Sequence, residues 1–260
     1  MAVSPTVSLN NGVAMPRVGF GTWQVDQRVI ELALAAGYRS IDTASMYGNE
    51  PDVARAIAKS GIPRNELFVT TKVWDDAHGY DRTLRSFEES RRRLALDLVD
   101  LYLIHWPAPG QDRYIETWRA LEWLLAEGSV RAIGVSNFEP AHLDRLARET
   151  DTVPAVNQIK LNPYQPQREL RDYHSERRIA TEAWAPLGRG EVLGDPVVAE
   201  LAQRYGRTPA QIVLRWSIQH DIVAIPRSSN PSRIEENLDV FGFELDARAM
   251  ERIDALSHGA

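Results

Sequence analysis

Short apolar runs recur along the chain, each followed by a polar turn and then by an amphipathic stretch. Most runs are apolar or β-branched with little alternation, which is typical of parallel strands that are covered on both faces. We expect eight strands, at residues 18–21, 40–44, 68–72, 99–105, 132–136, 155–159, 180–184 and 222–226.

Helical periodicity follows the strands. Val29, Leu32 and Ala33 share one face of a predicted helix that Gly37 ends. Thr208 is suited to an N-cap because Pro209 follows it at the first helical position. Helices are predicted at residues 28–36, 114–127, 197–205, 210–220, 232–240 and 247–256.

This alternation of strand and helix indicates a parallel sheet with helical cover. Eight such units in 260 residues fit a closed (β/α)8 barrel, the TIM barrel, within the α/β class. Residues 7–13 precede the first strand and predict an N-terminal β-hairpin with an Asn-Gly turn. No linker or further repeat interrupts the pattern, so we expect a single domain over residues 1–260.

Composition narrows the function classes. The chain has no cysteine, which excludes disulfides and thiolate metal sites and fits a reducing, cytoplasmic compartment. Neither a signal peptide nor an apolar run of about 18 residues is present, so we expect no membrane span. A formal net charge of −6 argues against nucleic acid as a partner, and no exposed apolar stripe predicts an oligomer, so we expect a monomer.

Ionisable side chains gather where the predicted strands end. Asp42 and Lys72 end the second and third strands, Tyr47 follows in a loop, and His105 ends the fourth strand. Taken alone, the aspartate could cap a helix, the histidine could be a core residue and the lysine could be solvated. Together they point to one barrel mouth, where function sits in this architecture.

Adjacent strands lie about 4.8 Å apart, so Lys72 can pair with Asp42. The pairing keeps the lysine charged, and a cation beside Tyr47 is expected to lower a phenol pKa that is ordinarily about 10. His105 could hydrogen-bond the same substrate oxygen. The set predicts acid–base chemistry on a carbonyl or an alcohol.

At these residues the sequence resembles the aldo-keto reductase family over nearly its whole length. The motifs are "MPRVGFGTW" at 15–23, "YRSIDTASMYGNE" at 38–50, "VTTKVW" at 69–74, "DLYLIHWP" at 100–107, "IGVSNF" at 133–138, "PAVNQIKLNPY" at 154–164, "WAPLGRG" at 184–190 and "IPRSSNPSRIEENLDVF" at 225–241. Within the family the chain is most similar to the bacterial 2,5-diketo-D-gluconic acid reductases, notably in having Trp184 where many relatives carry tyrosine.

The resemblance implies NADPH-dependent reduction of aldehydes and ketones by hydride transfer. Tyr47 would be the general acid, Lys72 and Asp42 would tune it, and His105 would orient the carbonyl. A substrate pocket is expected around Trp23, Tyr47, Trp74, His105 and Trp106. The loop at 107–113 and the loop after Trp184 are short, and the chain ends soon after residue 256, so we expect an open pocket and a broad substrate range.

A Rossmann cofactor site is unsupported, since Gly19 and Gly21 begin a G-x-G-x-x-G pattern that Gln24 ends. The family instead binds its dinucleotide across the barrel mouth. Arg227 and Arg233 could both hold a 2′-phosphate, which predicts NADPH over NADH. The resemblance implies these cofactor-binding residues: Gly21, Thr22, Trp23, Asp42, Ser136, Asn137, Gln158, Trp184, Leu187, Gly188, Pro226, Arg227, Ser228, Ser229, Arg233, Glu236 and Asn237.

Two other functions stay open from the residues alone. A strand-end lysine such as Lys72 can be the nucleophile of a Schiff-base lyase, although a nearby Asp42 would keep it protonated. A sensor or regulatory protein that binds NADPH with little turnover is the second. A metal enzyme is not indicated, because the six histidines show no paired spacing such as H-E-x-x-H.

Overall fold

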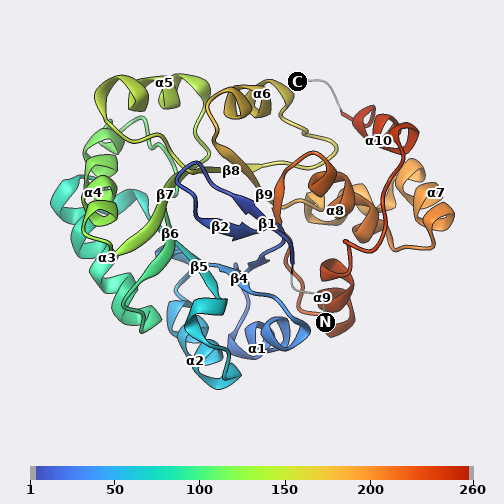
Figure 1. Cartoon of the computed structure of the whole chain (residues 1–260), viewed down its shortest axis with the longest axis horizontal. Coiled ribbons are helices and arrows are strands. Elements are labelled where there is room, and N and C mark those ends of the chain that lie inside the picture. Colours follow the sequence, from blue (N-terminus) through green and yellow to red (C-terminus); the bar gives the residue numbers. More distant parts are fainter. Residues whose placement is uncertain (1–3, 258–260) are drawn as a thin grey trace.

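Eight parallel strands form the centre of the computed structural model, which describes residues 4–257 (Figure 1). The described part leaves out residues 1–3 and 258–260. The two ends of the predicted 1–260 domain therefore lie outside it. The strands are β3 (Phe20–Gly21), β4 (Ser40–Asp42), β5 (Phe68–Val73), β6 (Val99–Ile104), β7 (Val130–Ser136), β8 (Val156–Lys160), β9 (Ala180–Trp184) and β10 (Val223–Ile225).

Each strand pairs with the next in chain order. Residues 17–21 at the first strand meet β10 and the residue after it through backbone hydrogen bonds and an isolated bridge from Val18 to Ala224. The Gly19 amide donates to the Ala224 carbonyl at 2.9 Å, and the Ala224 amide donates to the Arg17 carbonyl at 3.0 Å. Gly21 continues the seam with a bond from its amide to the Pro226 carbonyl at 3.1 Å. These bonds close the sheet, so the predicted (β/α)8 barrel is confirmed.

Helices surround the barrel on its outside (Figure 1). They are α1 (Gln27–Ala36), α2 (Glu50–Ser60), α3 (Tyr80–Leu94), α4 (Tyr114–Ala126), α5 (Pro140–Glu149), α6 (Arg168–Glu176), α7 (Pro196–Tyr205), α8 (Pro209–Gln219), α9 (Pro231–Leu238) and α10 (Ala247–Asp254). Short 3-10 turns are η1 (Ser45–Tyr47), η2 (Arg64–Glu66), η3 (Asp75–Ala77) and η4 (Gly188–Gly194). Across residues 4–257, no helix combines the length and the apolar character that crossing a membrane requires.

The predicted helix boundaries have visible causes. Gly37 follows α1 with φ at 111°, a left-handed conformation that favours glycine, and its amide bonds the last turn. Thr208 caps α8 through its side chain, and Gln211 bonds back to the Thr208 amide to complete a capping box. The caps that the sequence indicated at these two positions are therefore present.

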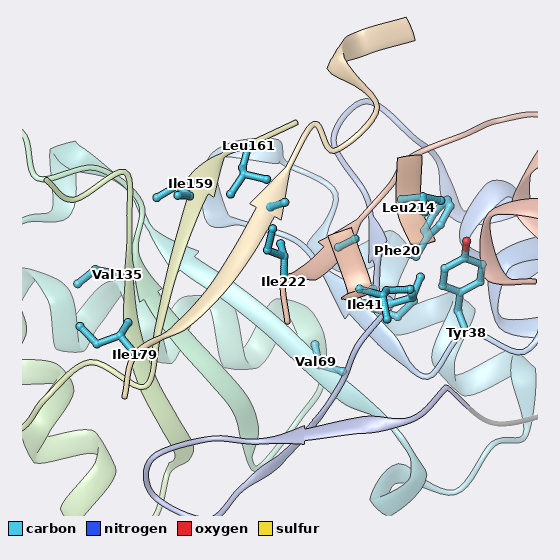
Figure 2. Close-up of a cluster of buried hydrophobic side chains, with 14 of the residues drawn as sticks. Phe20, Tyr38, Ile41, Val69, Val135, Ile159, Leu161, Ile179, Leu214 and Ile222 are labelled. Atoms are coloured by element: carbon cyan, nitrogen blue, oxygen red, sulfur yellow. The ribbon is translucent and has the colours of Figure 1, made fainter. Parts of the chain in front are cut away.

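Two apolar layers hold the fold. The outer layer lies between the strands and the helices, and Figure 2 shows part of it, with Ile41 and Val69 from neighbouring strands. The inner layer fills the barrel and includes Phe68, Leu101 and Leu103. Burying each large apolar side chain contributes about 1.5–3 kcal/mol, so both layers stabilise the barrel strongly.

An antiparallel hairpin of β1 (Thr6–Ser8) and β2 (Ala14–Pro16) crosses one end of the barrel (Figure 1). Its loop is tied to the strands by two side chains: Asn10 donates to the Pro154 carbonyl at 3.1 Å and Asn11 donates to the Arg131 carbonyl at 2.9 Å. Residues 131 and 154 lie at the amino ends of β7 and β8, so the predicted hairpin closes the end opposite the carboxyl ends of the strands.

Candidate active site

A buried ion pair lies at the carboxyl end of the barrel. The Lys72 Nζ atom is 2.6 Å from Asp42 Oδ1, and the two side chains are 0 % and 3 % exposed. Lys72 also donates to the Thr43 carbonyl at 3.0 Å. On β5, Lys72 shares the inward face with Phe68 because side chains alternate along a strand. The ion pair therefore sits above the apolar interior, and the predicted pairing is present.

Burial works to lower the pKa of Lys72, but the Asp42 carboxylate raises it, and the net shift is upward. Lys72 is therefore an ammonium at neutral pH.

Tyr47 is held beside this ammonium by a short 3-10 turn. The Ser45 hydroxyl donates to the Lys72 carbonyl at 2.9 Å, and Gly48 ends the turn with φ at 71°. The Lys72 Nζ atom is 5.2 Å from the centre of the Tyr47 ring.

The expectation that Lys72 lowers the pKa of Tyr47 overall is wrong. Burial of the phenol raises the pKa of Tyr47, the charge of Lys72 lowers it, and the net shift is upward. Desolvation of the phenolate thus outweighs the attraction of the cation.

His105 directly follows β6 and is 8 % exposed. Burial, and then the nearby Lys72 charge, lower the pKa of His105 to about 3, so its imidazole is neutral at physiological pH. Its ring lies 5.7 Å from the Tyr47 ring and 5.0 Å from the Trp74 ring, centre to centre. A neutral imidazole here can donate a hydrogen bond without adding a second positive charge.

Two of the predicted pocket residues, Trp23 and Trp74, form an aromatic wall with Tyr47 and His105. The Trp23 ring lies 4.9 Å from the Tyr47 ring, and Trp74 contacts His105 on the other side. Trp106 is 40 % exposed, and no ring contact ties it to this wall within the described residues. Its place in the pocket stays a prediction.

Polar side chains at the ends of β7, β8 and β9 form a second group. The Ser136 hydroxyl donates to the Gln158 carbonyl at 2.8 Å, and Asn137 donates to Ser136 Oγ at 2.9 Å and to the His105 carbonyl at 3.1 Å. The Trp184 indole N–H donates to Asn137 Oδ1 at 2.8 Å. These bonds fix the Asn137 amide and the Trp184 indole, two of the expected cofactor-binding residues.

Glu182 is the residue that the sequence reasoning missed. It is 1 % exposed on β9, and the Gln158 Nε2 atom donates both to Glu182 Oε2 at 2.7 Å and to Asp42 Oδ2 at 2.8 Å. Strand alternation held a signal, since residue 182 shares the face of residues 180 and 184 in the predicted strand 180–184. An inward-facing glutamate in an apolar strand needs a partner.

The predicted phosphate end lies at the seam between β3 and β10. The Arg227 guanidinium donates to the Trp23 carbonyl at 2.8 Å and approaches Gln24 Oε1 at 3.3 Å. Arg233 is exposed in the first turn of α9, where its amide donates to Asn230 Oδ1 at 3.2 Å. No contact joins the two guanidinium groups within residues 4–257, so a shared phosphate stays a prediction.

The remaining predicted cofactor residues flank the same rim. Thr22 donates through its hydroxyl to the Asp42 carbonyl at 2.9 Å, and a Cβ at Gly21 would meet the Ile225 carbonyl at 3.3 Å. The others lie in the loop after β9, the loop after β10, and α9: Leu187 and Gly188, then Pro226, Ser228 and Ser229, and then Glu236 and Asn237. Among the described residues, no group of three or more histidine, aspartate or glutamate side chains is arranged to hold a metal ion.

Comparisons with known proteins agree with this geometry. The model of the aldo/keto reductase family matches residues 17–258. An aldo-keto reductase of Mycolicibacterium smegmatis is 50 % identical over 99 % of this chain and 95 % of its own length. The glyoxal reductase of Bacillus subtilis is 47 % identical over 98 % of this chain and 94 % of its own length.

Among solved structures, a mutant of Gox0644 in complex with NADPH is similar, with a TM-score of 0.95 and 46 % identity over 98 % of this chain and 94 % of that one. The particular similarity to 2,5-diketo-D-gluconic acid reductases stays a prediction. The chain belongs to the aldo/keto reductase family and is an oxidoreductase.

Proposed function

We propose that this protein reduces aldehydes and ketones to alcohols with NADPH, and that Tyr47 is the general acid. The observation that carries the proposal is the buried Lys72–Asp42 pair at 2.6 Å, with the Tyr47 ring 5.2 Å from Lys72 Nζ. Such a cation stabilises the tyrosinate that forms when the phenol gives up its proton.

Each side chain has one task in this mechanism. NADPH, when bound, supplies the hydride that reduces the carbonyl carbon. Tyr47 donates its phenolic proton to the carbonyl oxygen, while neutral His105 donates a hydrogen bond to that oxygen and orients it. Lys72 stays charged because Asp42 pairs with it, and its ammonium stabilises the tyrosinate.

The residues present fit NADPH. The Ser136, Asn137 and Gln158 side chains supply donors and acceptors for a carboxamide, and the Trp184 indole, fixed by Asn137, supplies a face for stacking. Arg227 and Arg233 supply the positive charge for the 2′-phosphate.

The substrates are small aldehydes, ketones and dicarbonyls. A similar protein is a glyoxal reductase, and the aromatic wall is open enough that Trp23 is 42 % exposed. A sugar diketone of the 2,5-diketo-D-gluconic acid type also belongs to this class. The protein acts as a cytoplasmic monomer built as one domain, without a nucleic-acid partner.

The test is a screen of NADPH consumption, followed by absorbance, against a panel of small aldehydes, ketones and dicarbonyls, repeated with NADH. Substrate-dependent oxidation of NADPH that Tyr47→Phe abolishes supports the proposal. Oxidation that is equal in the Tyr47→Phe variant would overturn the role of the phenol. A borohydride-trapped adduct on Lys72 would support a lyase, which the Asp42 pairing disfavours because it keeps the amine protonated.

A further inference from the structure

Glu182 ends a chain of polar contacts that crosses the barrel beneath the proposed site. Lys72 from β5 pairs with Asp42 from β4, and Asp42 accepts from Gln158 on β8. Gln158 and Glu182 are register partners on β8 and β9, and the same Gln158 nitrogen donates to Glu182. The glutamate is fully enclosed, so its contact with Gln158 belongs to the interior of the barrel.

The two carboxyl groups determine which end of the Gln158 amide faces the interior. An amide nitrogen has two hydrogens to donate, and Asp42 and Glu182 accept both. A flipped amide would set the Gln158 Oε1 atom against Asp42, whose ionised carboxylate has no hydrogen to donate. The bonded arrangement leaves Oε1 without a donor among the described residues, so it is free to accept from a bound molecule.

We propose that Glu182 is a positioning residue, which holds the Gln158 amide so that its carbonyl oxygen accepts from the carboxamide N–H of the nicotinamide. The inference rests on the proposed function, because it takes Gln158 as part of the cofactor site. Glu182 itself touches neither the cofactor nor the reacting atoms and acts through Gln158.

The surroundings of Glu182 support an uncharged acid at this position. Its second oxygen, Oε1, is buried and has no hydrogen-bond partner among the described residues. Burial first, and then the charge of Asp42, raise the pKa of Glu182 to about 8. Asp42 and Lys72 are the charged groups that act on it, and its own ionisation would raise the pKa of Tyr47 further. A neutral Glu182 accepts the Gln158 bond without opposing the general acid.

The experiment compares two reduced cofactors in the intact enzyme. One is NADPH, and the other is an analogue in which an acetyl group replaces the carboxamide, so that it lacks the N–H donors. Glu182→Met removes the acceptor for Gln158 at similar size and should lower kcat/KM for NADPH by roughly tenfold, the worth of about one hydrogen bond. With the analogue the loss should shrink to within about twofold, since no N–H is left to misplace.

Glu182→Gln is the rescue variant, because its side-chain carbonyl can accept the same bond. It should recover most of the loss seen in Glu182→Met. In a Gln158→Met background the Glu182→Met change should have no further effect, because the residue acts through the amide. Glu182→Ala, which cannot overpack the barrel, provides a second truncation should Glu182→Met not fold.

An equal loss with NADPH and the analogue, or an undiminished effect in the Gln158→Met background, would overturn the positioning role. Wild-type enzyme that oxidises NADPH with carbonyls while Glu182→Met is unchanged would overturn this inference alone. If no carbonyl in the panel supports NADPH oxidation by the wild-type enzyme, that result would instead overturn the proposed function.

Discussion

Replacing Lys72 by methionine should destabilise the protein strongly as well as inactivate it. The substitution leaves the Asp42 carboxylate buried, with the Gln158 amide as its remaining side-chain donor at 2.8 Å. Breaking a buried pair by removing one partner costs about 3–5 kcal/mol, because the other charge stays uncompensated. That is a large share of the roughly 5–15 kcal/mol by which a folded domain is stable.

The assay is the free energy of unfolding from urea titrations, with Lys59→Met as the matched control. Lys59 pairs with Glu31 at 2.7 Å, but its side chain is 68 % exposed, so its loss should cost at most about 1 kcal/mol. A double variant, Asp42→Asn with Lys72→Met, removes both charges and should regain most of the stability without regaining activity. The reasoning fails if Lys72→Met costs no more than Lys59→Met.

Three further predictions follow from the site. Tyr47→Phe should lower kcat by at least about a hundredfold, the usual worth of a general acid, while the Kd for NADPH measured by fluorescence titration stays within about twofold; a Kd that rises in parallel would mean that the phenol binds the cofactor. Arg233→Ala should raise the Kd for NADPH by roughly ten- to a hundredfold and leave NADH binding unaffected, since a charged hydrogen bond contributes about 1.5–3 kcal/mol. Equal weakening of NADPH and NADH binding would show that Arg233 does not bind the 2′-phosphate. The folded-state pKa of Glu182, about 8, is raised from 4.5, so its contribution to stability is present at low pH and lost as the pH rises through about 8. Glu182→Gln should therefore lessen the decline in unfolding free energy between about pH 6 and pH 8, by up to about 1.4 kcal/mol per pH unit, and identical slopes in the two proteins would show that Glu182 does not titrate there.

The barrel could be predicted because its strands are buried on both faces. Such strands are continuous apolar runs in the sequence, so each predicted strand overlaps an observed one. The first is shorter than expected: Val18 makes only an isolated bridge to Ala224, and β3 begins at Phe20. Closure of the barrel, not the local pattern, decides where that strand starts.

The apolar periodicity of some helices is too weak to predict where they begin and end. On α3 the buried face includes Thr83 and Ser90 beside Phe87 and Leu94, so half of its inward positions are polar. On α6 the buried positions include His174, whose ring bonds other side chains in the interior. Hydrogen bonds make these polar residues acceptable inside: Thr83 donates to the Ala77 carbonyl, Ser90 accepts from Arg93, and His174 bonds Asn157 and Thr181. A periodicity based on apolar residues does not detect them.

The part of the site that could be predicted is the part that strand register determines. Asp42 ends β4 and pairs in register with Thr70 on β5, and Lys72, two residues beyond Thr70, lies on the same face, so the contact of Lys72 with Asp42 follows from the sheet. The upward pKa shift of Tyr47 depends on how deeply the loop packs, and the contact of Arg227 with the Trp23 carbonyl joins residues 204 positions apart. Neither property is local in the chain, so neither could be predicted from it.

The hairpin at the far end of the barrel bears on where the site exchanges protons. Below the polar groups Lys72, Asp42, Gln158 and Glu182 lie apolar side chains such as Phe68, Leu101 and Leu103, and the β1–β2 hairpin covers the bottom of the barrel. We therefore expect Tyr47, as the proposed general acid, to regain its proton from the carboxyl end of the barrel, where the neighbouring Trp23 is 42 % exposed.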